Sequence, residues 1–220
     1  MALEQAVWEV LKDRRPATLL CLGYPDLLIT DRLDCPVVED RGIAAWHHWD
    51  GPIYETTAAL ERLGISPVYI DVHPSRGAER VVDLNYPLPA DLCGAFDAVL
   101  DPGTLEHCFN IGQAFRNVVQ ALKPGGFAVH TNPLSQANHG FWSINPTAYH
   151  DFYGALGFRV ETVILGGPVA RRERFSGVTT ERFHAGPELV NLCVATAPGE
   201  VTVAGWPTQT KYRNNPDLKA

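Results

Sequence analysis

The sequence alternates short apolar runs with segments of helical spacing, and most of the runs end at a glycine or a polar residue. The apolar runs are 17–22, 67–70, 80–84, 96–100, 127–130, 158–165 and 189–196, and the segments of helical spacing are 3–12, about 55–64, 104–122 and 146–156. Short buried strands that alternate with helices indicate a mostly parallel sheet covered on both faces. The predicted fold class is therefore α/β, with a Rossmann-like sheet whose ligands bind at the carboxyl ends of the strands.

The length of 220 residues suits one domain, and we predict a single domain over 1–220. The first strand and the next helix are separated by residues from about 27 to 54, although such connections usually hold about 2 to 6 residues. We therefore predict an inserted functional loop there. Its stretch from Trp46 to Asp50 carries two indoles and is expected to cover the crevice. The residues from about 205 to 220 are expected to form an irregular tail.

Charge and composition exclude several classes of function. The chain has 18 Lys and Arg against 25 Asp and Glu, a net charge of -7, and no basic block, which argues against nucleic acid as the main ligand. No apolar window suits a membrane span, and the first residues do not resemble a signal peptide, so we expect a cytoplasmic protein. The five cysteines are scattered without CxxC spacing, so we expect reduced thiols and no structural metal.

Two blocks carry a family resemblance. FDAVLDPGTLEHCFN spans a predicted strand and the start of a helix that Thr104 can cap, and ALKPGGFAVHTNPL ends that helix and forms the next strand. With their order and spacing, residues 16–165 resemble the class I S-adenosylmethionine-dependent methyltransferases. The resemblance implies the class I methyltransferase type of Rossmann-like fold, methyl transfer, and S-adenosylmethionine as cofactor.

The resemblance also implies the cofactor contacts, which we expect at Gly23, Tyr24, Asp26, Asp71, Asp83, Leu84 and Asp101. Asp71 is placed for the ribose hydroxyls, and Asp83 is placed for the adenine amino group with Leu84 covering the base. Gly23 lets the backbone approach the ligand. The alternatives are structural, since each aspartate can serve a turn. The sequence departs from the family here, because CLGYPD keeps one glycine of the usual glycine-rich turn, and Asp26 either supplies the usual carboxylate or caps the next segment.

The loop NHGFWSINP, after the strand that ends near His130, is expected to hold the acceptor. With DPGTLEHCFN and LGYPD it resembles a bacterial subgroup of methyltransferase-like proteins. The expected acceptor contacts are Glu106, His130, Asn138, Phe141, Trp142 and Asn145. His107 and His139 are the candidate catalytic bases, because loops after adjacent parallel strands open on one edge of a sheet. The alternatives are that His130 hydrogen-bonds to a backbone carbonyl and that Glu106 only stabilises the start of the helix through the helix dipole.

The predicted function is methyl transfer to oxygen or nitrogen of a small polar acceptor, such as a sugar or a natural-product intermediate. We expect a small-molecule substrate and neither nucleic acid nor a membrane as partner. One alternative is a methyltransferase-fold protein that binds or assembles without transferring methyl groups. Another is a metal-dependent lyase or isomerase in which His107, His130 and His139 converge with Glu106 or Asp101.

Overall fold

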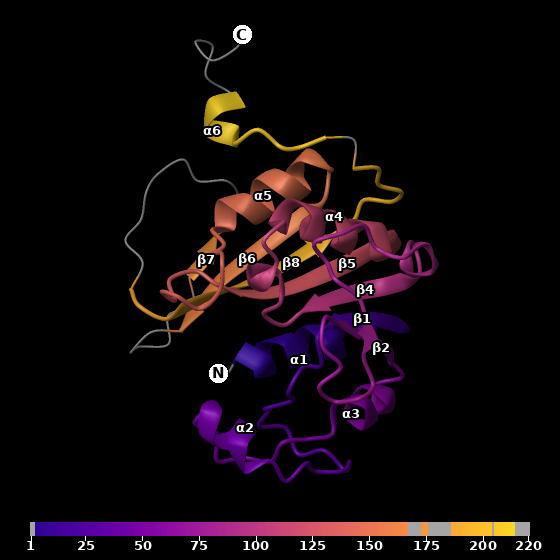
Figure 1. Ribbon diagram of the computed structural model, residues 1–220, viewed down its shortest axis with the longest axis vertical. Helices are drawn as coiled ribbons and strands as arrows, with labels where there is room; N and C mark the ends of the chain where they lie inside the picture. The colour runs from indigo at the N-terminus through magenta and orange to yellow at the C-terminus, as the bar shows by residue number, and fades with distance from the viewer. Residues whose placement is uncertain (1–2, 167–172, 176–185, 204, 214–220) are drawn as a thin grey trace.

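An eight-stranded sheet forms the centre of the molecule, with the order β3-β2-β1-β4-β5-β8-β6-β7 (Figure 1). The computed structural model describes residues 3–166, 173–175, 186–203 and 205–213. The strands are β1 (Thr18–Leu22), β2 (Ser66–Asp71), β3 (Arg80–Val81), β4 (Phe96–Asp101), β5 (Leu122–Pro133), β6 (Arg159–Gly166), β7 (Glu173–Phe175) and β8 (Leu189–Thr196). The first five strands pair in parallel, and β8 runs antiparallel between β5 and β6. This topology confirms the predicted α/β Rossmann-like class.

Helices cover both faces of the sheet (Figure 1). The helices are α1 (Leu3–Arg14), α2 (Arg41–Trp46), α3 (Thr56–Arg62), α4 (Ile111–Ala121), α5 (Pro146–Ala155) and α6 (Thr210–Arg213). Because successive strand residues point to opposite faces, Leu19 and Cys21 pack with α1 and α3, whereas Leu20 and Leu22 pack with α4 and α5. Across the described ranges, every helix is too short or too polar to cross a membrane.

The helix that we predicted from Thr104 to Leu122 is interrupted, so that prediction was wrong at its start. A short 3-10 turn covers Leu105–His107, and α4 begins only at Ile111. Two side chains account for the break: Asp101 accepts hydrogen bonds from the backbone N–H groups of Thr104 and Leu105, and Asn110 caps α4 by accepting one from Gln113. Thr104 makes no capping hydrogen bond.

The segment 27–54, predicted as an inserted loop, contains α2 and packs against α1. Tyr54 pairs with Leu27 and with Val37 through isolated bridges, which draw the two ends of the segment together. Asp31 accepts hydrogen bonds from the Trp8 indole at 3.0 Å and from Lys12 at 2.7 Å. These contacts anchor the first part of the insertion on the helix that also covers the sheet.

The described part of the predicted tail, residues 205–213, lies over the α4 and α5 side of the sheet (Figure 1). The guanidinium of Arg116 lies 4.0 Å from the centre of the Trp206 ring, and the backbone N–H of Thr210 donates to Asp151 at 3.1 Å. Residues 214–220 lie outside the described residues.

Asn117 provides a test of how α4 holds the loop that follows β3. Its buried carboxamide accepts from the Leu88 N–H and donates to the carbonyls of Leu84 and Tyr86. Replacing Asn117 by Ala leaves these groups without partners, so we expect the free energy of unfolding to fall by about 2 to 4 kcal/mol in urea titrations. Gln120→Ala, on the exposed side of the same helix, is the control and should change the free energy of unfolding little. Equal effects of the two substitutions would contradict the role given to Asn117.

Candidate active site

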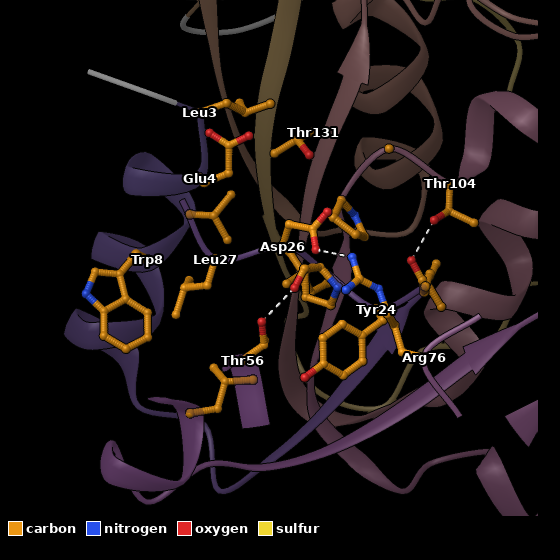
Figure 2. A pocket seen from close by; sticks show the side chains of 18 of the residues that line it. Leu3, Glu4, Trp8, Tyr24, Asp26, Leu27, Thr56, Arg76, Thr104 and Thr131 are labelled. Carbon is orange, nitrogen blue, oxygen red and sulfur yellow. Dashed lines mark hydrogen bonds and ion pairs between the residues drawn. The ribbon is translucent and has the colours of Figure 1, made fainter. Parts of the chain in front are cut away.

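A cavity of about 390 Å³ opens where β1, β2 and β4 end, at the carboxyl edge of the sheet (Figure 2). Four of the predicted cofactor residues line it, namely Gly23, Tyr24, Asp26 and Asp71. Its far wall is α1, which contributes Glu4 and Trp8 among others. The structure therefore brings the residues predicted for the turn after β1 and for the end of β2 to one cavity.

Gly23 forms the floor of the gap between two polar side chains. Its φ of +87° is a conformation that favours glycine, and its N–H donates to the Ile70 carbonyl at 2.7 Å. A Cβ at this position would lie 3.4 Å from Thr104 Oγ1 and 3.6 Å from Asp71 Oδ2. Thr104 is itself held by donating to the Leu22 carbonyl. Any side chain at position 23 would thus project between Asp71 and Thr104.

The cavity is rich in carboxylates. Asp26 forms an ion pair with Arg76 at 2.6 Å, and Figure 2 shows this pair above the ring of Tyr24. Burial raises the pKa of Asp26, an effect that Arg76 opposes. Burial likewise raises the pKa of Glu4, which lies 4.0 Å from His47. His47 belongs to the stretch from Trp46 to Asp50 and lines the cavity, but whether that stretch opens and closes remains a prediction.

Three predicted cofactor residues do not line this cavity. Asp83 is exposed and accepts from the Asn85 N–H, which is the turn role that we considered as its alternative. Leu84 packs in the core under α4 with 4% of its surface exposed. Asp101 is fully buried and organises the turn that follows β4. Their roles toward a cofactor remain predictions.

A buried polar network lies beside the cavity, beneath the same edge of the sheet. The Asn132 Nδ2 group donates to Asp101 Oδ2 at 2.9 Å and to Glu106 Oε2 at 2.8 Å. The Tyr149 hydroxyl donates to Asn132 Oδ1. Burial raises the pKa of Tyr149 well above its usual range, so this phenol stays protonated. Asn132 and Tyr149 are not among the predicted site residues, because their roles depend on tertiary contacts.

His130 is held inside the same network. It is fully buried and lies 2.8 Å from Asp101 Oδ2 through Nδ1 and 2.7 Å from the Tyr153 hydroxyl through Nε2. Asp101 Oδ2 accepts from Asn132 and also faces Nδ1, so the ring carries a proton on Nδ1 and donates it to this carboxylate. His130 thus bonds side chains, not the backbone carbonyl of its alternative interpretation, and it has no exposed surface for an acceptor.

Glu106, His107 and His139 come together on the solvent side of this network. His139 Nε2 lies 3.6 Å from Glu106 Oε1, and the two imidazole rings are 5.4 Å apart between centres. Glu106 is 1% exposed, whereas both histidines are exposed. Burial, and then the charge of Asp101, raise the pKa of Glu106 to about 7. Burial, and then the neighbouring His139, lower the pKa of His107. The expected proximity of the two histidines is therefore present.

Backbone contacts fix this arrangement. The N–H groups of Phe141 and Trp142 both point to the Glu106 carbonyl, at 2.9 and 3.3 Å. Gly140 permits the approach, since a Cβ there would lie 2.9 Å from that carbonyl oxygen. The Trp142 indole donates to the Cys108 carbonyl at 3.0 Å. The loop after β5 is thereby attached to the turn after β4.

Three exposed aromatic rings lie on the same two loops as the histidines. Phe109 and Phe141 meet edge to face at 5.4 Å, and Trp142 lies 6.4 Å from Phe109. The exposed fractions are 71% for Phe109, 63% for Phe141 and 40% for Trp142, which is high for rings of this size. Phe109 falls inside the segment 104–122 that was predicted as one helix, but it lies before the start of α4 at Ile111 and is exposed. The other predicted acceptor residues, Asn138 and Asn145, are also exposed on this loop.

No family model matches the sequence, and no curated protein matches it. Among solved structures, the chain is similar to the CMeT domain of the citrinin polyketide synthase, with 16% identity and a TM-score of 0.48 over 84% of this chain and 47% of that one. It is similar to a SAM-dependent methyltransferase from Archaeoglobus fulgidus, with 14% identity and a TM-score of 0.49 over 88% and 94% of the two chains. It is also similar to the 1,6-didemethyltoxoflavin-N1-methyltransferase of Burkholderia thailandensis, solved with S-adenosylhomocysteine, at 14% identity and a TM-score of 0.47 over 88% and 76%. The chain spans about half of the first of these structures.

The raised pKa of Glu106 predicts a pH-dependent stability. The folded chain binds this proton at a pKa of about 7 and the unfolded chain near the ordinary value of 4.5, so stability falls as pH rises between these values. The loss is on the order of 3 kcal/mol by pH 8. Glu106→Gln should remove this loss of stability. The free energy of unfolding in urea, measured with a chelator present, should therefore be higher for the variant than for the parent at pH 8 and equal for the two near pH 5. Glu161→Gln, on an exposed strand position, is the control; parallel pH profiles of the parent and Glu106→Gln would contradict the assignment.

Proposed function

We propose that this protein transfers a methyl group from S-adenosylmethionine to oxygen or nitrogen of a small polar acceptor. The observation that carries the proposal is the shared turn after β4. Gly103 and Thr104 line the cavity, while a Cβ on Gly103 would lie 3.2 Å from Glu106 Oε1, at the edge of the histidine cluster. A donor in the cavity and an acceptor at the cluster would therefore lie beside the same short turn, and the proposed transfer needs the methyl group to reach the acceptor past the edge of that turn.

The residues of the cavity suit the donor. Gly23 adds no side chain between Asp71 and Thr104 at the edge of the cavity, and Asp71 offers a carboxylate for paired hydroxyls. Glu4, Asp26 and Asp71 make the cavity acidic, which favours a ligand carrying a sulfonium and an ammonium group. S-adenosylmethionine would supply an electrophilic methyl group, whose bond to sulfur breaks with the electron pair staying on sulfur to give S-adenosylhomocysteine.

Proton removal from the acceptor is assigned to the histidine cluster. The lowered pKa of His107 keeps its imidazole neutral near pH 7, so that it can accept a proton from a hydroxyl or ammonium group. His139 is the second candidate, and Glu106 orients it from 3.6 Å. The acceptor oxygen or nitrogen would then form its new bond to carbon with the electron pair that the lost proton leaves.

The exposed rings of Phe109, Phe141 and Trp142 are the proposed acceptor surface. Their faces can stack on a sugar or an aromatic ring, and the polar groups beside them can orient it. A small acceptor is supported by the placement of these rings on two short loops that are fastened together at the Glu106 carbonyl.

Donor binding is tested by calorimetry with S-adenosylhomocysteine. Asp71→Asn should weaken binding by about 1 to 3 kcal/mol, because the hydroxyls lose a charged acceptor. Asp83→Asn, measured beside it, determines whether the exposed Asp83 also contacts the ligand. Glu161→Gln is the control and should bind like the parent. Absence of binding by the parent chain would overturn the proposed function and favour a protein that binds or assembles without transferring methyl groups.

The catalytic assignment is tested by transfer of labelled methyl groups to a panel of simple phenols, hexoses and amines. With an acceptor found, His107→Gln combined with His139→Gln should lower kcat by roughly 10² to 10⁴ while leaving S-adenosylhomocysteine affinity unchanged. Trp142→Ala should act mainly on the acceptor KM. Full turnover by the double variant would show that positioning alone suffices and would remove both histidines from the mechanism.

A further inference from the structure

We propose that Glu106, His107 and His139 form a binding site for one divalent cation of the zinc class. The carboxylate oxygen Oε1 of Glu106 and one ring nitrogen of each histidine would be the ligands. Their donor atoms all lie within 4.8 Å of one another in the described part of the chain. The site lies on the solvent side of the turn after β4, opposite the donor cavity.

The spacing of these atoms suits a first-row metal. Bonds of about 2.0 to 2.2 Å from zinc to nitrogen and oxygen place two ligand atoms at most about 4.4 Å apart. His139 Nε2 and Glu106 Oε1 are already 3.6 Å apart. The two histidines are exposed, so a small rotation of either imidazole is enough to complete the site. Two imidazoles and one carboxylate are a ligand set typical of zinc and of non-haem iron.

The carboxylate is fixed before any ion arrives. Asn132 Nδ2 holds Glu106 Oε2 at 2.8 Å, and Tyr149 in turn holds Asn132. Within the described ranges, no hydrogen bond engages the other oxygen, Oε1, which faces His139. A ligand held by such outer contacts binds a metal without reorganisation. One rigid ligand and two adjustable ones therefore meet at one point.

The local charge favours a cation. Asp101 and Glu106 place two buried carboxylates on one amide group of Asn132. The ion pairs of the described residues bring only histidine to these carboxylates, His130 to Asp101 and His139 to Glu106, and neither lysine nor arginine. Two buried negative groups without a permanent positive partner repel each other, and a divalent ion between the imidazoles would relieve that repulsion.

The ion would also have open positions. Three protein ligands leave at least one site of a tetrahedral zinc ion free, as in catalytic zinc centres. Phe109 and Phe141 lie next in sequence to the ligand-bearing segments, so an acceptor that stacks on their rings can place an oxygen at the ion. This role of the open position rests on the proposed function, and in the ion-bound chain the ion takes the place of His107 and His139 in proton removal, because an imidazole that holds the ion has no lone pair left to accept a proton. The ion would instead lower the pKa of the bound acceptor group, whose proton passes to water. The binding of the ion itself does not rest on the proposed function.

The experiment uses the full chain after removal of metals with a chelator, in a Cys93→Ser background that removes the exposed thiol. Calorimetry with zinc chloride should give one ion per chain, and cobalt chloride should give the visible absorption of a nitrogen and oxygen site without a thiolate band. Glu106→Gln and His139→Ala should each weaken zinc binding by at least about tenfold. His48→Asn is the matched control, because His48 is exposed, lies outside the cluster, and has a φ of +49° that asparagine tolerates.

Each outcome decides the assignment. Failure of zinc and cobalt to bind the parent chain, or equal affinity in Glu106→Gln, His139→Ala and the control, would overturn it. Circular dichroism and S-adenosylhomocysteine binding by the same variants show that they are folded, so loss of the ion cannot be mistaken for unfolding. A chain that binds S-adenosylhomocysteine but no zinc refutes the cation site alone, and one that binds zinc but no S-adenosylhomocysteine refutes the proposed function alone.

Discussion

The hydrogen bonds from one amide group, Asn132 Nδ2, to Asp101 and Glu106 determine the shape of the whole site. Two buried carboxylates from the same turn would repel each other, and the shared donor keeps them at fixed positions. The turn then presents Thr104 to the cavity and Glu106 to the histidines. Because Tyr149 on α5 orients Asn132, the helix that covers one face of the sheet also sets the geometry of its edge.

The sequence was sufficient to predict the fold class and the parallel half of the sheet, whereas the site residues stay predictions. The spacing of apolar residues, which distinguishes strands from helices, is a local property of the sequence. Five of the strands in this sheet are parallel, so their carboxyl ends lie at one edge. This is why Gly23 and Asp71 share a cavity and why His107 and His139 are neighbours although distant in the chain. Both pairings follow from topology, without any knowledge of side-chain packing.

Other parts of the site depend on contacts between distant segments and could not be predicted in this way. Glu4 reaches the cavity because α1 packs across the sheet edge, and nothing in the helical spacing of that segment distinguishes it. The helical spacing around Phe109 was real, yet Asp101 and Asn110 broke the helix by hydrogen bonding to the backbone. Local propensity was overridden by tertiary structure at the point where the candidate chemistry lies, as is common at functional sites.

Gly103 belongs to both halves of the site, since it lines the cavity and lies against the Glu106 carboxylate and the Thr131 carbonyl. With so little space, a displacement of this turn on one side is transmitted to the other. Under the proposed function the two halves would therefore be thermodynamically linked: a ligand in the cavity would change the free energy of binding at the cluster, and a ligand at the cluster would change binding in the cavity by the same amount. The absence of a side chain at a single residue would then make the two binding events interdependent.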